Sequence, residues 1–212
     1  MPSFKKTVTL FSSCLAATAK AFPTSTAAEI NNSTPSCPEA NETARIYASE
    51  LYNLFPGQPD LASPPVADFH VQYNNQTGLV IQQAAVFSKL PKEATGCYFG
   101  WAQDDAWTGI LVAGGSGLLT GRQLAGFPNA TGNRGVSAAA VKPFDTASPD
   151  KAFEADFTSW DREIKGTYHI SGPDKISCAE EVYLIIEKPQ TTNGNVFLKR
   201  TQNAGIFLEY RC

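Results

Sequence analysis

Residues Val66–Leu90 read VADFHVQYNNQTGLVIQQAAVFSKL, and from this stretch onward the hydrophobic pattern has a period of two. Such a period is typical of β-strands, because successive side chains on a strand point to opposite faces. The Asn74-Asn75 pair in the middle of the stretch favours a turn. We therefore predict strands over Ala67–Tyr73 and Leu79–Leu90.

The same pattern predicts further strands over Cys97–Gln103, Gly109–Ala113, Gly117–Leu124, Ala152–Trp160, Gly166–Ser171, Glu181–Lys188, Val196–Thr201 and Gly205–Cys212. Turn-forming residues separate these segments and no helical segment does, which favours an antiparallel β-sandwich over residues 66–212. The last two strands are expected to pair as a hairpin. Alternation along the final strand places Cys212 on the same face as Leu208 and Tyr210.

One helix is predicted upstream, over Pro38–Leu54. The apolar residues Ala44, Tyr47, Leu51 and Leu54 recur there at spacings of three and four, Ser36 can cap the helix, and Pro56-Gly57 ends it. Residues 37–65 would then form a helix and a linker. The predicted fold class is mainly β, an antiparallel β-sandwich with one short N-terminal helix.

The first 21 residues have the pattern of a secretory signal peptide. A basic start at Met1–Lys6 precedes the apolar run Thr7–Ala19, and Ala19-Lys20-Ala21 suits a signal peptidase, with Ala17-Thr18-Ala19 as the alternative site. The apolar run is much shorter than the roughly 20 residues of a membrane span, so we expect no membrane anchor. Residues 22–36 lack periodicity and are predicted to be a flexible leader. The expected location is secreted and extracellular.

Cleavage after residue 21 leaves 191 of the 212 residues and removes three lysines, which changes the formal net charge from -3 to -6. A mildly acidic chain without clustered Lys and Arg argues against nucleic acid as a partner.

Cleavage also removes Cys14 and leaves Cys37, Cys97, Cys178 and Cys212. An even number of cysteines in an oxidising compartment predicts two disulfides, and four cysteines allow three pairings. We favour Cys97 with Cys178 and Cys37 with Cys212, because the second pair would hold both ends of the folded region. A zinc site is the competing interpretation, but there is no close pair of cysteines and there are only two histidines. No metal and no cofactor is expected.

Sequons for N-glycosylation begin at Asn31, Asn32, Asn41, Asn75 and Asn129. Together with a signal peptide, they predict a glycoprotein in which these positions are exposed.

The segments Ala85–Pro91, Gly96–Trp101, Ile176–Cys178 and Asn203–Tyr210 resemble the fungal But-two (Uba-three-binding) carboxy-terminal domain family. The resemblance covers Val66–Cys212. It implies a β-sandwich of the kind found in secreted fungal proteins and a disulfide between Cys97 and Cys178. It implies no catalytic residues, and the intracellular binding role behind the family's name does not fit a chain with a signal peptide.

Two kinds of residue are candidates for catalysis. Glu154 and Asp156 share one face of a predicted strand and could serve as a glycosidase pair, although an exposed polar face opposite a core face of Phe153, Ala155 and Phe157 explains them more simply. His70 and His169 each lie in an alternating strand, where a histidine on the polar face is the ordinary interpretation. We assign no catalytic residue.

Trp101, Trp107 and Trp160 are the candidate ligand-binding residues, because exposed tryptophan rings can stack on sugars. The alternative is that they fill the core. Our hypothesis is a secreted, non-enzymatic glycoprotein that acts at or outside the fungal cell surface by binding a wall glycan or a partner or host protein. The alternatives are a small glycan-active hydrolase that uses Glu154 and Asp156, and a structural wall or matrix protein.

Overall fold

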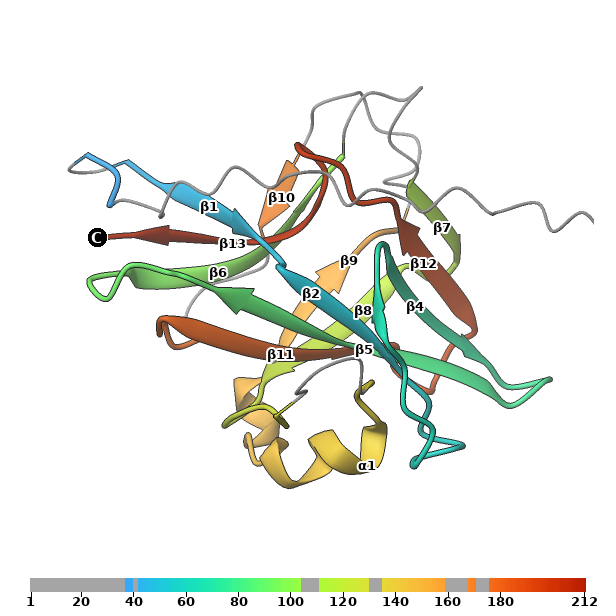
Figure 1. Cartoon of the computed structure of the whole chain (residues 1–212). Helices are drawn as coiled ribbons and strands as arrows, with labels where there is room; N and C mark the ends of the chain where they lie inside the picture. The colour runs from blue at the N-terminus through green and yellow to red at the C-terminus, as the bar shows by residue number, and fades with distance from the viewer. Residues whose placement is uncertain (1–36, 40–41, 104–110, 130–134, 159–167, 171–175) are drawn as a thin grey trace, which may run out of the picture. The chain divides into compact units, whose positions relative to one another are not determined.

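Antiparallel strands make up about half of the computed structural model, which describes residues 37–39, 42–103, 111–129, 135–158, 168–170 and 176–212 (Figure 1). The elements in chain order are β1 Ala44–Tyr47, β2 Glu50–Leu54, β3 Pro65–Val66, β4 Phe69–Asn74, β5 Leu79–Ser88, β6 Thr95–Ala102, β7 Leu111–Gly115, β8 Leu118–Gln123, α1 Ala138–Val141, two 3-10 turns at Lys142–Phe144 and Pro149–Lys151, β9 Phe153–Asp156, β10 Tyr168–Ile170, β11 Glu181–Glu187, β12 Gly194–Leu198 and β13 Gly205–Arg211.

The strands form two sheets. The smaller sheet has the order β1-β13-β6-β10, and the larger has the order β7-β12-β4-β5-β11-β8-β9, with β2 pairing with β5 and β3 pairing with β2. Each pairing between these strands is antiparallel. The predicted class, mainly β and antiparallel with one short helix, is therefore confirmed.

The main hydrophobic core lies between the two sheets. Phe99 of β6 and Leu208 of β13 are fully buried together with Phe87 of β5 and Leu184 of β11. The strand β9 shows how the sequence pattern produces this core, because its apolar residues are buried while the polar residues between them are exposed. The alternation that predicted the strands is thus the alternation between the core and the surface.

A second, smaller core covers the opposite face of the larger sheet. Ile185 of β11 and Leu54 of β2 pack there against Val136 and Val141, which belong to the α1 region. Figure 1 shows this region on the side of β5 and β11 that faces away from β1 and β13. The sequence analysis predicted no helix at residues 138–141.

An ion-pair network fastens the α1 region to the sheet. The Arg122 guanidinium of β8 donates to both carboxylate oxygens of Asp145, at 2.6 and 2.5 Å, and also to Glu187 of β11. These partners raise the pKa of Arg122, the Asp145 hydrogen bonds most strongly, so Arg122 stays charged. All three side chains are about one-fifth to one-quarter exposed.

The predicted helix over Pro38–Leu54 is wrong. This region contains β1, which pairs with β13 of the smaller sheet, and β2, which pairs with β5 of the larger sheet. The chain crosses between the sheets at Ala48-Ser49, where the Ala48 amide donates to Ile206 O and the Ser49 amide donates to Val86 O. Two short strands on either side of a crossing placed their apolar residues at spacings of three and four, which imitates a helix.

The predicted hairpin between the last two strands is also wrong. The strand β12 pairs with β4 and β7 in the larger sheet, and β13 pairs with β1 and β6 in the smaller sheet. The chain therefore crosses between the sheets again over residues 199–204.

Arg200 joins the two crossings. Its Nη1 donates to the carbonyl oxygens of Ala48 at 2.9 Å and Ser49 at 3.2 Å, and its backbone amide donates to Asp68 Oδ1 at 3.0 Å. Ala48 is almost completely buried, so the guanidinium satisfies carbonyl groups at a place where neither sheet supplies partners for them.

Two disulfides, Cys37–Cys212 and Cys97–Cys178, link residues 175 and 81 positions apart. These are the pairs that the sequence analysis favoured, and they leave no thiolate of the four for a zinc site. On the chain-entropy model, loops of these lengths contribute about 4 to 5 kcal/mol each. No helix in the described part of the chain is long and apolar enough to cross a membrane.

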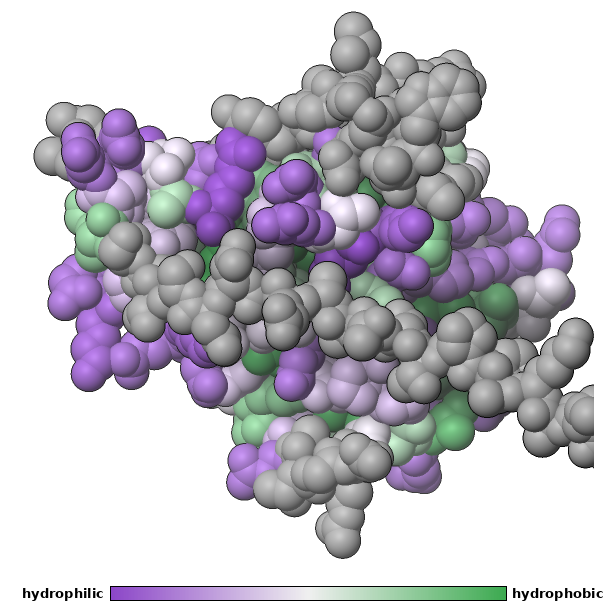
Figure 2. Space-filling view, turned by 45° about the horizontal axis from the view of Figure 1, so that its top comes forward, coloured by the Kyte–Doolittle hydropathy of each residue, from purple (hydrophilic) through white to green (hydrophobic). Residues whose placement is uncertain are grey.

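Hydrophilic residues are spread over the visible face of the molecule, with smaller hydrophobic areas between them (Figure 2). Among the described residues, the large apolar side chains that are clearly exposed are Leu61 and Leu79.

Replacing Arg200 with alanine is expected to lower the free energy of unfolding by about 2 to 4 kcal/mol, because the loss of a charged donor leaves two carbonyl groups unpaired. Urea denaturation followed by circular dichroism would measure the change. Lys199→Ala is the matched control, since Lys199 is the exposed neighbour, and we expect it to change stability by less than about 0.5 kcal/mol. Equal effects of the two substitutions would contradict the bridging role of Arg200.

Candidate binding groove

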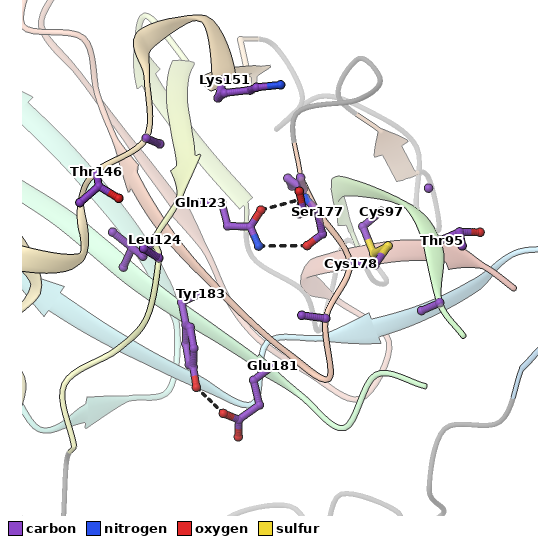
Figure 3. Close-up of a pocket in the computed structure, with 16 residues that line it drawn as sticks. Thr95, Cys97, Gln123, Leu124, Thr146, Lys151, Ser177, Cys178, Glu181 and Tyr183 are labelled. Atoms are coloured by element: carbon purple, nitrogen blue, oxygen red, sulfur yellow. Dashed lines mark hydrogen bonds between the residues drawn. A yellow bond between two sulfur atoms is a disulfide. The ribbon is translucent and has the colours of Figure 1, made fainter. Parts of the chain in front are cut away.

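A groove of about 780 Å³ opens where the beginnings of β6 and β11 meet the end of β8 (Figure 3). The strands β6 and β11 belong to different sheets. The groove therefore lies at an end of the sandwich where both sheets contribute to the walls.

The segment 176–180 forms the wall next to the smaller sheet. Cys178 is joined by its disulfide to Cys97 in β6, and Ile176 pairs with Cys97 in an isolated antiparallel bridge. The same segment is tied to the end of β5 by a hydrogen bond from the Leu90 amide to Glu180 O, at 3.1 Å. This wall is therefore fixed at several points.

Gln123 joins the segment 176–180 to the larger sheet. Its Oε1 accepts from the Ser177 amide at 2.8 Å, and its Nε2 donates to Ser177 O at 2.9 Å (Figure 3). The side-chain amide of Gln123 thus forms the same two kinds of hydrogen bond with the Ser177 backbone that a residue on a neighbouring β-strand would form. Gln123 positions the wall, and its amide is already engaged.

Tyr183 and Glu181 of β11 form part of the opposite wall. The Tyr183 ring stacks on Phe127 with 5.2 Å between ring centroids, and its hydroxyl donates to Glu181 Oε2. Burial, followed by the hydrogen bond to Glu181 and the negative charge of that carboxylate, raises the pKa of Tyr183 to about 12. Tyr183 is consequently a neutral phenol at physiological pH. The hydrogen of its hydroxyl group is already engaged in the hydrogen bond to Glu181.

The remaining lining is small and mostly uncharged. Thr95, Thr146 and Ser177 are exposed hydroxyl residues, and alanines fill much of the space between them. Among the described residues that line the groove, Lys151 and Glu181 are the charged ones, with opposite signs. Such a lining can offer hydrogen bonds and small apolar contacts to a neutral polar ligand.

The candidate carboxylates lie elsewhere. Glu154 and Asp156 are both exposed on β9 and share a face, as predicted, and neither lines the groove. Asp156 Oδ1 accepts from the Thr158 amide at 2.8 Å, which closes a local turn. The structure thus supports the simpler interpretation of this strand, an exposed polar face opposite a core face.

Trp101 is a core residue. It is 0% exposed, and its ring stacks on Phe157 with 4.0 Å between centroids. It therefore presents no face to a ligand, in agreement with the alternative that the sequence analysis left open. Trp107 and Trp160 lie outside the described residues.

His70 lies on β4 between the core residues Phe69 and Val71, on the face away from the main core. It is half-buried against Phe197 of β12, with 5.9 Å between the rings, and burial lowers its pKa. The backbone of His169 pairs with Trp101 of β6. His70 does not line the groove.

Two sequon asparagines, Asn75 and Asn129, fall in the described part of the chain, and both are exposed as predicted. Asn31, Asn32 and Asn41 lie outside the described residues. Among the described residues, no three His, Cys, Asp or Glu side chains gather as a metal-binding cluster.

The groove residues Gln123, Ser177 and Tyr183 were not predicted as a site. Gln123 and Tyr183 belong to no motif, and the sequence signal at Ser177 is its place in the segment Ile176–Cys178. No family model and no curated protein matches the chain.

His70 predicts a dependence of stability on pH. Because burial lowers its pKa in the folded state, the unfolded chain binds a proton more readily, and stability falls as the pH drops below the unfolded value of about 6.5. We expect the free energy of unfolding to fall more between pH 7.5 and pH 5.5 in the wild type than in His70→Gln. Urea titrations at several pH values test this, and parallel curves for the two proteins would refute it.

Proposed function

We propose that the protein is a secreted, non-enzymatic glycoprotein that acts at or outside the fungal cell surface and binds a neutral wall glycan in the groove between β6 and β11. The observation that carries the proposal is the groove itself, which is open, fixed in shape and lined mainly by uncharged hydrogen-bonding and small apolar groups. Its volume of about 780 Å³ falls within the range of ligand-binding sites in proteins.

The chemistry of the lining favours a sugar over a charged ligand. Sugar hydroxyl groups donate and accept hydrogen bonds, which matches the side chains of Thr95, Thr146 and Ser177. The charges of Lys151 and Glu181 oppose each other, so the lining has no net field to attract an anion or a cation. An open groove also suits a polymer that extends beyond the site at both ends.

The rigidity of the groove supports a binding role. A wall held by a disulfide and by the Gln123–Ser177 hydrogen bonds loses little conformational entropy when a ligand binds. The groove is thus preorganised for binding.

Secretion is supported by independent features. Two disulfides are typical of proteins that fold in an oxidising compartment, and the sequons at Asn75 and Asn129 are exposed. The signal-peptide pattern of residues 1–21 agrees with both. We also propose that the chain is related to the But-two carboxy-terminal domain family, because Cys97 and Cys178, which carry part of that resemblance, form the disulfide that it implies.

The test compares two alanine-to-tryptophan substitutions. Ala179 is exposed on the groove wall, whereas Ala140 is exposed on α1 and does not line the groove. We expect the wild type to be retained on at least one of chitin, β-glucan and cellulose in a pull-down. Ala179→Trp should weaken retention by about tenfold or more, which corresponds to about 1.4 kcal/mol, while Ala140→Trp should leave it unchanged.

Thermal unfolding of both variants checks that each is folded. Absence of retention on all three polysaccharides would overturn the glycan proposal, and capture of a secreted or host protein that Ala179→Trp abolishes would replace it with a protein ligand. Retention that Ala179→Trp does not weaken would show that binding lies outside the groove.

A further inference from the structure

A second hollow, of about 230 Å³, lies at the ends of β4, β7 and β12 in the larger sheet. Its lining comprises Gln72, Tyr73 and Asn74 of β4, Gly114 and Gly115 of β7, and the segment Asn193–Asn195. We call it the glycine hollow. It shares no lining residue with the groove of the proposed function.

The strand register brings two glycines side by side next to the hollow. Gly194 of β12 pairs with Gly115 of β7 on one side and with Tyr73 of β4 on the other. Gly115 has a φ of +71°, and a Cβ on it would lie 2.7 Å from Asn193 O; a Cβ on Gly194 would lie 2.3 Å from Ser116 O. Both positions therefore require glycine, and two adjacent strands end without side chains.

A sequon begins at the rim of this hollow. Asn75 follows the lining residue Asn74 and forms two hydrogen bonds with the lining residue Asn193. The Asn75 amide donates to Asn193 Oδ1 at 2.8 Å, and Asn193 Nδ2 donates to Asn75 Oδ1 at 2.7 Å. This reciprocal pair holds the Asn75 carboxamide by its oxygen and does not use Nδ2, the atom that carries an N-linked sugar.

The turn that carries the sequon is itself ordered by hydrogen bonds. Asn74 Oδ1 accepts from the backbone amides of Gln76 and Thr77, at 2.9 and 3.1 Å. A sugar on Asn75 would therefore start from a fixed point beside the hollow.

The lining is suited to an acetamido sugar. Gln72 and Asn195 pair across β4 and β12, so their side-chain amides share a face, and Asn74 supplies a further side-chain amide. In the described part of the chain, the buried Asn195 Oδ1 has no hydrogen-bond partner. The volume is of the size of a sugar residue and is far smaller than that of the groove.

We propose that the glycine hollow holds the first N-acetylglucosamine of a glycan on Asn75. The protein would thus bind its own modification, with the sugar covering the ends of β7 and β12, where glycines leave the backbone uncovered. The proposal rests on the secretion that the proposed function includes, because the glycan is added in the secretory pathway.

The test uses protein secreted from a eukaryotic host, with sequon occupancy measured by mass spectrometry and hydrogen exchange measured over residues 113–115 and 193–195. Thr77→Ala removes the sequon and keeps both hydrogen bonds between Asn75 and Asn193.

Gly114→Val keeps the sequon and places a side chain in the hollow. The backbone tolerates this substitution, because a Cβ on Gly114 would lie at an ordinary contact distance of 3.5 Å from Asn195 Nδ2. An endoglycosidase trims the wild-type glycan to a single N-acetylglucosamine.

We expect exchange in both segments to be several-fold slower in the wild type, intact or trimmed, than in Thr77→Ala or Gly114→Val. Thr131→Ala, which removes the sequon at Asn129, is the control and should leave exchange unchanged. A secreted protein without a glycan on Asn75, or one whose exchange is the same in Thr77→Ala or in Gly114→Val, would overturn this proposal alone. A chain that is not exported would overturn the proposed function as well.

Discussion

The contact between Arg200 and the carbonyl groups of Ala48 and Ser49 is the interaction on which the two-sheet arrangement depends. The chain crosses between the sheets at both places, once near its beginning and once near its end. Ala48 and Ser49 lie on the first of these crossings, and the guanidinium of Arg200 on the later one donates to the carbonyl groups of both residues. Because β1 joins β13 in one sheet while β2 and β12 lie in the other, this contact holds together two points at which the chain passes between the sheets.

The groove follows from the same arrangement at another place. Where β6 and β11 begin, the two sheets are joined through the segment 176–180, by a disulfide on one side and by Gln123 on the other. These links hold the sheets at a fixed separation and leave the space between them open. A sandwich end without the links would be free to close or to widen, so the links set the shape of the groove as well as contributing stability.

Most strands could be predicted from the sequence because alternation reports burial directly, as Phe153 to Asp156 illustrate. The segment 44–54 could not, because two short strands in different sheets produced a helical spacing, and only the hydrogen bonds of Ala48 and Ser49 reveal the crossing. The groove was equally hidden. Gln123 and Ser177 are 54 positions apart and gain their roles from tertiary pairing, which leaves no local pattern.

The groove and the glycine hollow have different origins, and this difference bears on what each can bind. The groove is a space between sheets, and part of its lining consists of exposed side chains such as Thr95, Thr146 and Ser177. The glycine hollow is bounded in part by Gly115 and Gly194, which cannot carry side chains because backbone atoms approach them closely, so this part of its boundary is backbone. A site made by the backbone suits a ligand attached to the same chain, whose identity is constant. A site made by exposed hydroxyl and alanine side chains suits an external ligand, because substitutions there can tune recognition at little cost to stability.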